Sequence, residues 1–144
     1  MSVRDVARET VADQLSGAAR GARAAYAVLA WALVVCVAYQ VFLAGLAVFV
    51  DPLMWGRHVF FVHLFELIPG VMVVLALVGR LPWRGGFYAG PIGIFLLIGL
   101  QYFFAGARGS ALAALHAVNA LFIFWAAAVL AQRAARLGRR SGEA

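Results

Sequence analysis

Four apolar runs in the chain are each long enough to cross a lipid bilayer as a helix, and they limit the fold more than any other feature. A membrane-spanning helix needs about 20 mostly apolar residues, and the runs are 26–50, 59–79, 87–107 and 111–131. Hydrophobic residues make up 65% of the 144 positions and charged residues only 12%, which is too apolar for a soluble domain of this size. The sequence therefore predicts an all-α integral membrane protein built as a four-helix bundle.

The arginines are divided unevenly between the two ends of the predicted helices. Only Arg57 and Arg108 lie in the first and third loops. The others flank the opposite helix ends: Arg4, Arg8, Arg20, Arg23, Arg80, Arg84, Arg133, Arg136, Arg139 and Arg140. Because basic residues are retained on the cytoplasmic side, we predict cytoplasmic termini and a location in the inner (plasma) membrane. The net charge of +6 then reflects membrane anchoring, and nucleic-acid binding is not expected.

The composition changes along the chain and predicts three parts. Residues 1–24 place Val3, Val6, Val11 and Leu15 on roughly one helical face, as in an amphipathic N-terminal helix lying on the cytoplasmic surface. Residues 25–132 form the four-helix transmembrane domain, and residues 133–144 form a basic cytoplasmic tail.

A short motif occurs twice and suggests an internal repeat. Residues 40–45 read QVFLAG and residues 101–106 read QYFFAG. Each copy leads through a loop into an apolar helix that carries a histidine and, three residues later, a polar residue: His63 with Glu66, and His116 with Asn119. We therefore predict two tandem helical hairpins related by pseudo-two-fold symmetry.

The strongly polar residues of the four helices are predicted to lie at one depth. Gln40, His63, Gln101 and His116 each lie 17 positions from the arginine nearest to the cytoplasmic end of the same helix. This spacing corresponds to about 25 Å of helix in every case. Polar groups at membrane depth are costly unless they face one another, a cofactor or water. The sequence therefore predicts a shared polar site near the outer face.

Two histidines on alternate helices of a bundle can supply both axial ligands of a haem iron, and we predict this role for His63 and His116. Gly70 lies about two turns from His63 and would leave room for the macrocycle. The remaining polar residues of these helices are predicted to orient the two ligands or to contact the cofactor: Gln40, Glu66, Gln101 and Asn119.

Plainer interpretations exist for the same residues. A histidine in a membrane helix can serve only as a hydrogen-bonding group between helices. His58 lies at the mouth of its helix and about 140° around the helix from His63, so we expect an interfacial residue there. A zinc or copper site would need three or four close ligands, and no nucleophile-base arrangement or phosphate-binding glycine loop is present. Whether the chain is an enzyme stays open, and a transporter or channel is disfavoured by the small number of polar residues.

The order of Q-x-F-x-A-G, a helix with histidine, a basic turn, a second Q-x-F-x-A-G and the run LHAVNAL resembles a family of short bacterial and archaeal four-helix membrane proteins without an assigned function. More distantly, residues 40–131 resemble one half of the haem A synthase family, whose four-helix bundles carry haem-ligating histidines on the second and fourth helices. The resemblance places those ligands at His63 and His116. Phe60 stands where that family has a glutamate, and the external cysteine pair is absent, so the resemblance implies haem binding but not haem-methyl oxidation.

The sequence thus predicts a membrane b-type haem protein with two histidine ligands that serves electron transfer or haem handling. The alternative is a cofactor-free accessory or structural subunit of a larger, respiratory-type membrane complex. The predicted partners are the lipid bilayer and either a membrane redox partner or such a complex, and a homodimer is left open.

Overall fold

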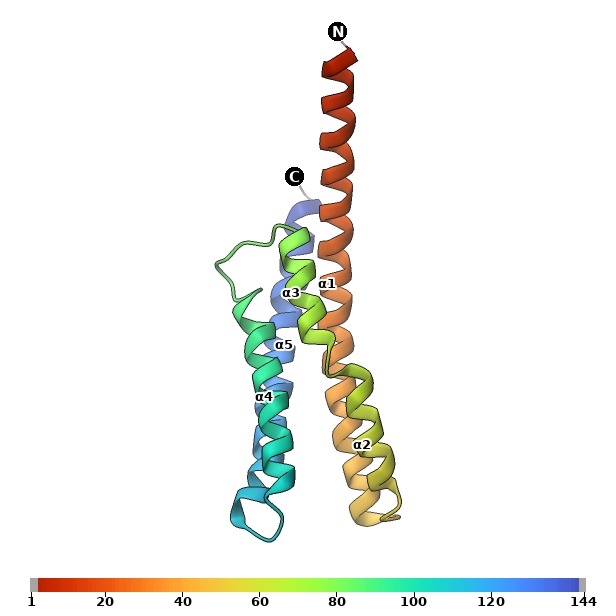
Figure 1. The fold of residues 1–144 in the computed structure, drawn as a ribbon, viewed down its shortest axis with the longest axis vertical. Coiled ribbons are helices and arrows are strands. Elements are labelled where there is room, and N and C mark those ends of the chain that lie inside the picture. The colour runs from red at the N-terminus through yellow and green to blue at the C-terminus, as the bar shows by residue number, and fades with distance from the viewer. Residues whose placement is uncertain (1–2, 143–144) are drawn as a thin grey trace.

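The computed structural model describes the backbone of residues 3–142 and the side chains of residues 16–138. This part of the chain is helical apart from its connections, which are turns and loops (Figure 1). The elements in chain order are α1 (Val3–Phe49), α2 (Met54–Phe65), α3 (Ile68–Val78), α4 (Ala89–Gly106), the short 3₁₀ helix η1 (Ala111–Ala114) and α5 (Leu115–Gly142).

Four segments are long and apolar enough to cross a membrane, which confirms the predicted multi-pass membrane protein. They are Ser16–Phe49, Met54–Val78, Ala89–Gly106 and Ala111–Gly138. The N-terminal part of α1 and the C-terminal part of α5 lie at the same end of the bundle (Figure 1), as an even number of spans requires. The side of the membrane on which they lie, and the identity of that membrane, stay predictions.

The N-terminal segment differs from the sequence-based prediction. A separate surface helix was expected over residues 1–24, whereas α1 is one helix from Val3 to Phe49. Its length of 47 residues corresponds to about 70 Å, more than twice the roughly 30 Å hydrocarbon core. The segment contains no proline, the residue that most strongly breaks a helix, so the helix can continue beyond the membrane without interruption.

The second span is broken between α2 and α3, next to the predicted Pro69-Gly70 kink. The helix is interrupted at Glu66 and Leu67, although both residues keep right-handed helical dihedral angles, and Pro69 occupies the first turn of α3. Proline has no N–H to donate to the carbonyl of Phe65, and its ring clashes with that carbonyl in a continuous helix. The break therefore changes the direction of the span (Figure 1).

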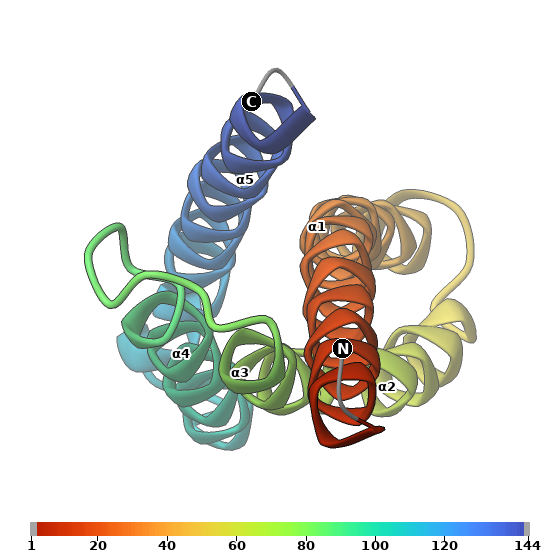
Figure 2. The same cartoon turned by 90° about the horizontal axis from the view of Figure 1, so that it is seen from above.

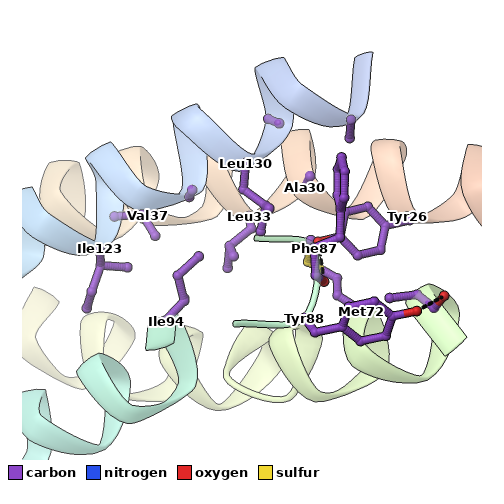
Figure 3. Packing of buried hydrophobic residues seen from close by; sticks show 14 of the residues in the cluster. Tyr26, Ala30, Leu33, Val37, Met72, Phe87, Tyr88, Ile94, Ile123 and Leu130 are labelled. Atoms are coloured by element: carbon purple, nitrogen blue, oxygen red, sulfur yellow. Dashed lines mark hydrogen bonds between the residues drawn. The ribbon is translucent and has the colours of Figure 1, made fainter. Parts of the chain in front are cut away.

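Most of the buried core lies in the half of the bundle that contains the termini. We call residues 16–37, 67–98 and 123–138 the termini-side half, and residues 38–66 and 99–122 the distal half. In the termini-side half, α1 packs against α3 and α5, and α4 also packs against α3 and α5. Side chains from these helices meet in one cluster around Tyr26, Leu33, Met72, Ile94 and Leu130 (Figure 3).

The connection between α3 and α4 is fixed to this cluster by buried hydrogen bonds. The hydroxyl of Tyr26 donates to the carbonyl of Phe87 at 2.9 Å. The hydroxyl of Tyr88 lies 3.0 Å from the carbonyl oxygens of both Ala76 and Leu81 and donates its proton toward them. The termini-side half is therefore closed by a well-packed loop as well as by its helices.

The helices of the distal half are arranged as two pairs. There α2 packs along α1, and α4 packs along α5, and the two pairs diverge toward the end opposite the termini (Figures 1 and 2). The polar residues singled out in the sequence lie in this half.

Candidate functional site

Gln40 and His58 form a reciprocal pair between α1 and α2. The side-chain amide of Gln40 donates to the backbone carbonyl of His58 at 2.8 Å. The Nδ1 atom of His58 lies 3.0 Å from the backbone carbonyl of Gln40, a contact in which the imidazole must be the donor. The Oε1 atom of Gln40 is buried and has no hydrogen-bond partner. His58 was expected to be an interfacial residue, but it is only 9% exposed and lies in the bundle interior.

Gln101 and His116 repeat part of this arrangement between α4 and α5. The Nδ1 atom of His116 lies 3.2 Å from the backbone carbonyl of Gln101. The amide of the buried Asn119 donates to the side-chain oxygen of Gln101 at 2.9 Å and to the carbonyl of Leu97 at 2.8 Å. The second copy is therefore the more completely hydrogen-bonded of the two.

The rings of His58 and His116 lie beside each other across the distal half. Their centroids are 6.2 Å apart and their planes are inclined by 51°. Trp55 packs its ring edge-to-face against His58 with a centroid distance of 5.4 Å. Because each Nδ1–H is directed to a backbone carbonyl, the lone pair of each neutral ring is on Nε2, the usual arrangement of a metal-binding histidine.

His63 and Glu66 lie in a second group that includes Tyr102 of α4. The Nδ1 atom of His63 lies 3.2 Å from Oε1 of Glu66 and 3.3 Å from the hydroxyl oxygen of Tyr102. The hydroxyl of Tyr102 donates to the other carboxylate oxygen of Glu66. We call these three residues the α2–α4 triad.

The structure therefore divides the predicted site into two groups. Gln40, Gln101 and Asn119 lie around a histidine pair that consists of His116 and His58, and not of His116 and His63. His63 and Glu66 belong to the triad, and the side chain of His63 is 52% exposed. At Gly70, a Cβ atom would meet nothing within 4 Å. The assignments of His63 as a metal ligand and of Gly70 as a cofactor contact stay predictions.

The helical period explains why His58 and His63 have different surroundings. Five residues turn a helix by about 140°, so only one of the two histidines can face the bundle interior. Counting from arginines favoured His63, whereas the loop length after each Q-x-F-x-A-G motif would have favoured His58. His58 follows Gln40 by 18 positions and His116 follows Gln101 by 15. Tyr102 was missed because an exposed tyrosine has no distinguishing spacing.

The available donors limit the chemistry of the histidine pair. In the part of the chain with described side chains, three or more His, Cys, Asp or Glu residues nowhere gather as they would around a metal ion. A bare zinc or copper ion needs more protein ligands than two imidazoles. Two imidazoles suffice when the other four ligands of the metal come from a macrocycle.

One comparison with known proteins gives a match. Residues 40–108 match a family of unknown function, DUF6220. The matched segment includes both Q-x-F-x-A-G motifs, His58 and the complete triad, and it ends before His116. Neither the curated proteins nor the solved structures contain a match, so the resemblance to haem A synthase stays a prediction. The chain is similar to a family without an assigned activity over slightly less than half of its length.

Proposed function

We propose that this multi-pass membrane protein binds a b-type haem through the imidazoles of His58 and His116, and that it serves electron transfer or haem handling. The proposal keeps the predicted chemistry and His116, and it replaces His63 by His58 as the second ligand. It places the site in the distal half, near the outer face of the plasma membrane when the termini are cytoplasmic.

The distance between the two rings carries the proposal. An imidazole nitrogen lies about 2.0–2.1 Å from a bound metal, and about 1.1 Å separates that nitrogen from its ring centre. Two imidazoles that held one metal ion between them would therefore have centroids roughly 6 Å apart. The observed 6.2 Å between His58 and His116 agrees with this separation. A bound haem would supply one-electron redox chemistry.

The surrounding residues would orient the two ligands. The backbone carbonyls of Gln40 and Gln101 accept from Nδ1 of His58 and His116, respectively, which fixes the tautomer that leaves Nε2 available. Asn119 holds the side chain of Gln101. The side-chain amide of Gln40 bonds the carbonyl of His58, and its buried Oε1 is an acceptor that a bound group or water could satisfy.

The same contacts support the proposed pseudo-two-fold relation of the hairpins. In both copies the glutamine of Q-x-F-x-A-G accepts, at its backbone carbonyl, from the histidine of the following helix. A duplicated hairpin would produce this equivalence and would also explain why the two histidines approach each other.

The first test is an optical spectrum of the gently solubilised protein, oxidised and reduced with dithionite. Wild-type protein should show a Soret band and the spectrum of six-coordinate, bis-imidazole haem. His58→Ala and His116→Ala should each lose that spectrum. Loss of a residue that only orients a metal ligand lowers affinity roughly 10- to 100-fold. Loss of a ligand itself should therefore lower haem affinity by at least this factor.

His63→Ala is the matched control, because it removes a histidine from the same helix at an exposed position. It should retain the wild-type spectrum. If His63→Ala loses haem and His58→Ala retains it, the sequence-based ligand pair is correct and ours is wrong. Wild-type protein that binds no haem when haem is supplied would end the proposal altogether.

A second candidate is the cofactor-free accessory subunit of a larger membrane complex. It is favoured by the fact that His58 and His116 already bond the backbone of a neighbouring helix, which suffices for a structural role. A stable, colourless protein that co-purifies with respiratory subunits, and that loses this association in His116→Ala, would support it.

A further inference from the structure

We infer that the α2–α4 triad of His63, Glu66 and Tyr102 binds the dihydroxylated ring of a quinol dissolved in the membrane. This site does not require haem and uses neither His58 nor His116. It rests on the exposure of the triad, on its hydrogen-bonding capacity and on the open space beside it.

The triad is accessible although it lies within two membrane-spanning segments. His63 and Glu66 belong to the span Met54–Val78, and Tyr102 belongs to Ala89–Gly106. The side chains of His63 and Glu66 are 52% and 27% exposed, and Tyr102 is 44% exposed. Polar groups at such positions are costly unless a polar partner reaches them. In lipid, that partner must itself be soluble in the membrane.

The hydrogen bonds within the triad leave several of its acceptor atoms available to a ligand. Tyr102 uses its hydroxyl proton on Glu66, and His63 directs Nδ1–H toward Glu66 and Tyr102. Nε2 of a neutral His63 therefore keeps its lone pair, and each carboxylate oxygen of Glu66 can accept further bonds. A ligand that donates O–H groups complements this set, whereas a phosphate headgroup would be repelled by the carboxylate.

Two glycines leave space next to the triad. Gly99 and Gly106 lie three residues before and four residues after Tyr102, so they share its face of α4. A Cβ atom at either glycine would meet nothing within 4 Å. On α2, the exposed Phe60 precedes His63 by one turn. The surroundings can therefore receive a flat ring with an apolar tail.

A quinol combines these properties. It has a flat ring, two hydroxyl donors and an apolar tail that keeps it in the bilayer. A metal ion fits poorly, since His63 and Glu66 are joined by no third His, Cys, Asp or Glu in the part of the chain with described side chains. The oxidised quinone has only acceptors, so the neutral histidine and the carboxylate should favour the reduced form.

The test is equilibrium dialysis of nanodisc-embedded protein against ubiquinol carrying one isoprene unit, with empty nanodiscs correcting for partition into lipid. The quinol should bind saturably. The corresponding quinone should bind at least about tenfold more weakly, because it cannot donate a hydrogen bond to the carboxylate, and such a bond is typically worth about this factor in affinity. Glu66→Gln and Tyr102→Phe should each weaken quinol binding about tenfold. Tail-less hydroquinone should bind more weakly than the isoprenoid quinol.

Tyr39→Phe is the matched control, because Tyr39 is 45% exposed in the first span and its ring packs on Phe61. This variant should bind quinol like the wild type. Gly99→Leu should weaken binding, because the leucine fills the open space while all three triad residues stay in place. This variant tests the inference even if a triad variant fails to fold. Equal binding of quinol and quinone would overturn the inference, as would unchanged binding in Glu66→Gln and Gly99→Leu, or no saturable binding at all.

His116→Ala separates this inference from the proposed haem site. Quinol binding should persist in that variant while its haem spectrum is lost. Protein that binds quinol but never haem would leave the triad site standing and remove the haem proposal, and the reverse result would do the opposite.

Discussion

The termini-side half and the distal half of the bundle hold their helices together by different means. All residues of the main core cluster except Phe65 lie in the termini-side half. In the distal half, the buried side chains outside that cluster are few: Leu43, Ala47, His58, Phe104 and Asn119. Two of these five are polar, and both make hydrogen bonds between helices.

This difference reflects how helices associate in lipid. Lipid tails are as apolar as leucine, so burial alone does not drive association, and packing and hydrogen bonds must do so. In the termini-side half, small residues such as Ala30, Ala76 and Ala127 are fully or almost fully buried and allow close approach. In the distal half, directional hydrogen bonds join the helices at single points.

The largest expected effect is a loss of stability in the termini-side half. Leu33 is completely buried, whereas Val35 on the same helix is 64% exposed. Leu33→Ala should lower the free energy of unfolding by about 2 kcal/mol. The substitution leaves a cavity in the packed core, which costs stability in lipid as in water. The transfer of the side chain out of water contributes little here, because the unfolded helices stay in lipid. Val35→Ala should change it by less than about 0.5 kcal/mol. Unfolding of the detergent-solubilised protein measures both, and equal losses would contradict the burial of Leu33 in a packed core.

A smaller effect is expected at the loop that closes the same half. Tyr88→Phe removes the hydroxyl that lies 3.0 Å from the carbonyls of Ala76 and Leu81. Loss of this buried donor should lower the free energy of unfolding by about 1–2 kcal/mol. Tyr39→Phe removes a hydroxyl from an exposed tyrosine and should have almost no effect in the same measurement. A Tyr88→Phe protein as stable as the wild type would show that the loop does not contribute to closure.

The fold was largely predictable because its main signals are local. Four apolar runs and the Pro69-Gly70 pair were enough to predict the spans and the interruption of the second one. The continuous α1 was not predicted, because a change in composition near Arg23 was interpreted as a boundary. Nothing between Val3 and Phe49 interrupts the hydrogen-bonding pattern of that helix.

The site was predictable only in its residue types. Gln101 contacts His116 and Asn119, and the ring beside His116 belongs to His58 and not to His63. Which of these two histidines lies there depends on the rotation of α2 about its axis. The tight turn after Phe49 and the packing of α2 on α1 set that rotation, and neither can be derived from counting residues. The partnership of Tyr102 with His63 and Glu66 is likewise a tertiary contact without a sequence signal.

The smallest expected effect compares the two glutamines of the repeated motif within the distal half. Gln101→Leu removes the acceptor for Asn119 and should lower the free energy of unfolding by about 0.6 kcal/mol, the average for hydrogen bonds between membrane helices. Gln40→Leu also removes a hydrogen bond, to the carbonyl of His58. That carbonyl lies within α2 and can still accept from the helix backbone.

Gln40→Leu also removes the buried Oε1 atom that has no partner, and eliminating an unsatisfied acceptor offsets the lost bond. We therefore expect a change within about 0.5 kcal/mol of zero, smaller than that of Gln101→Leu, in the same unfolding measurement. A larger loss for Gln40→Leu would mean that Oε1 has a donor in the folded protein. Repeating the comparison with haem supplied would show whether a bound group provides that donor.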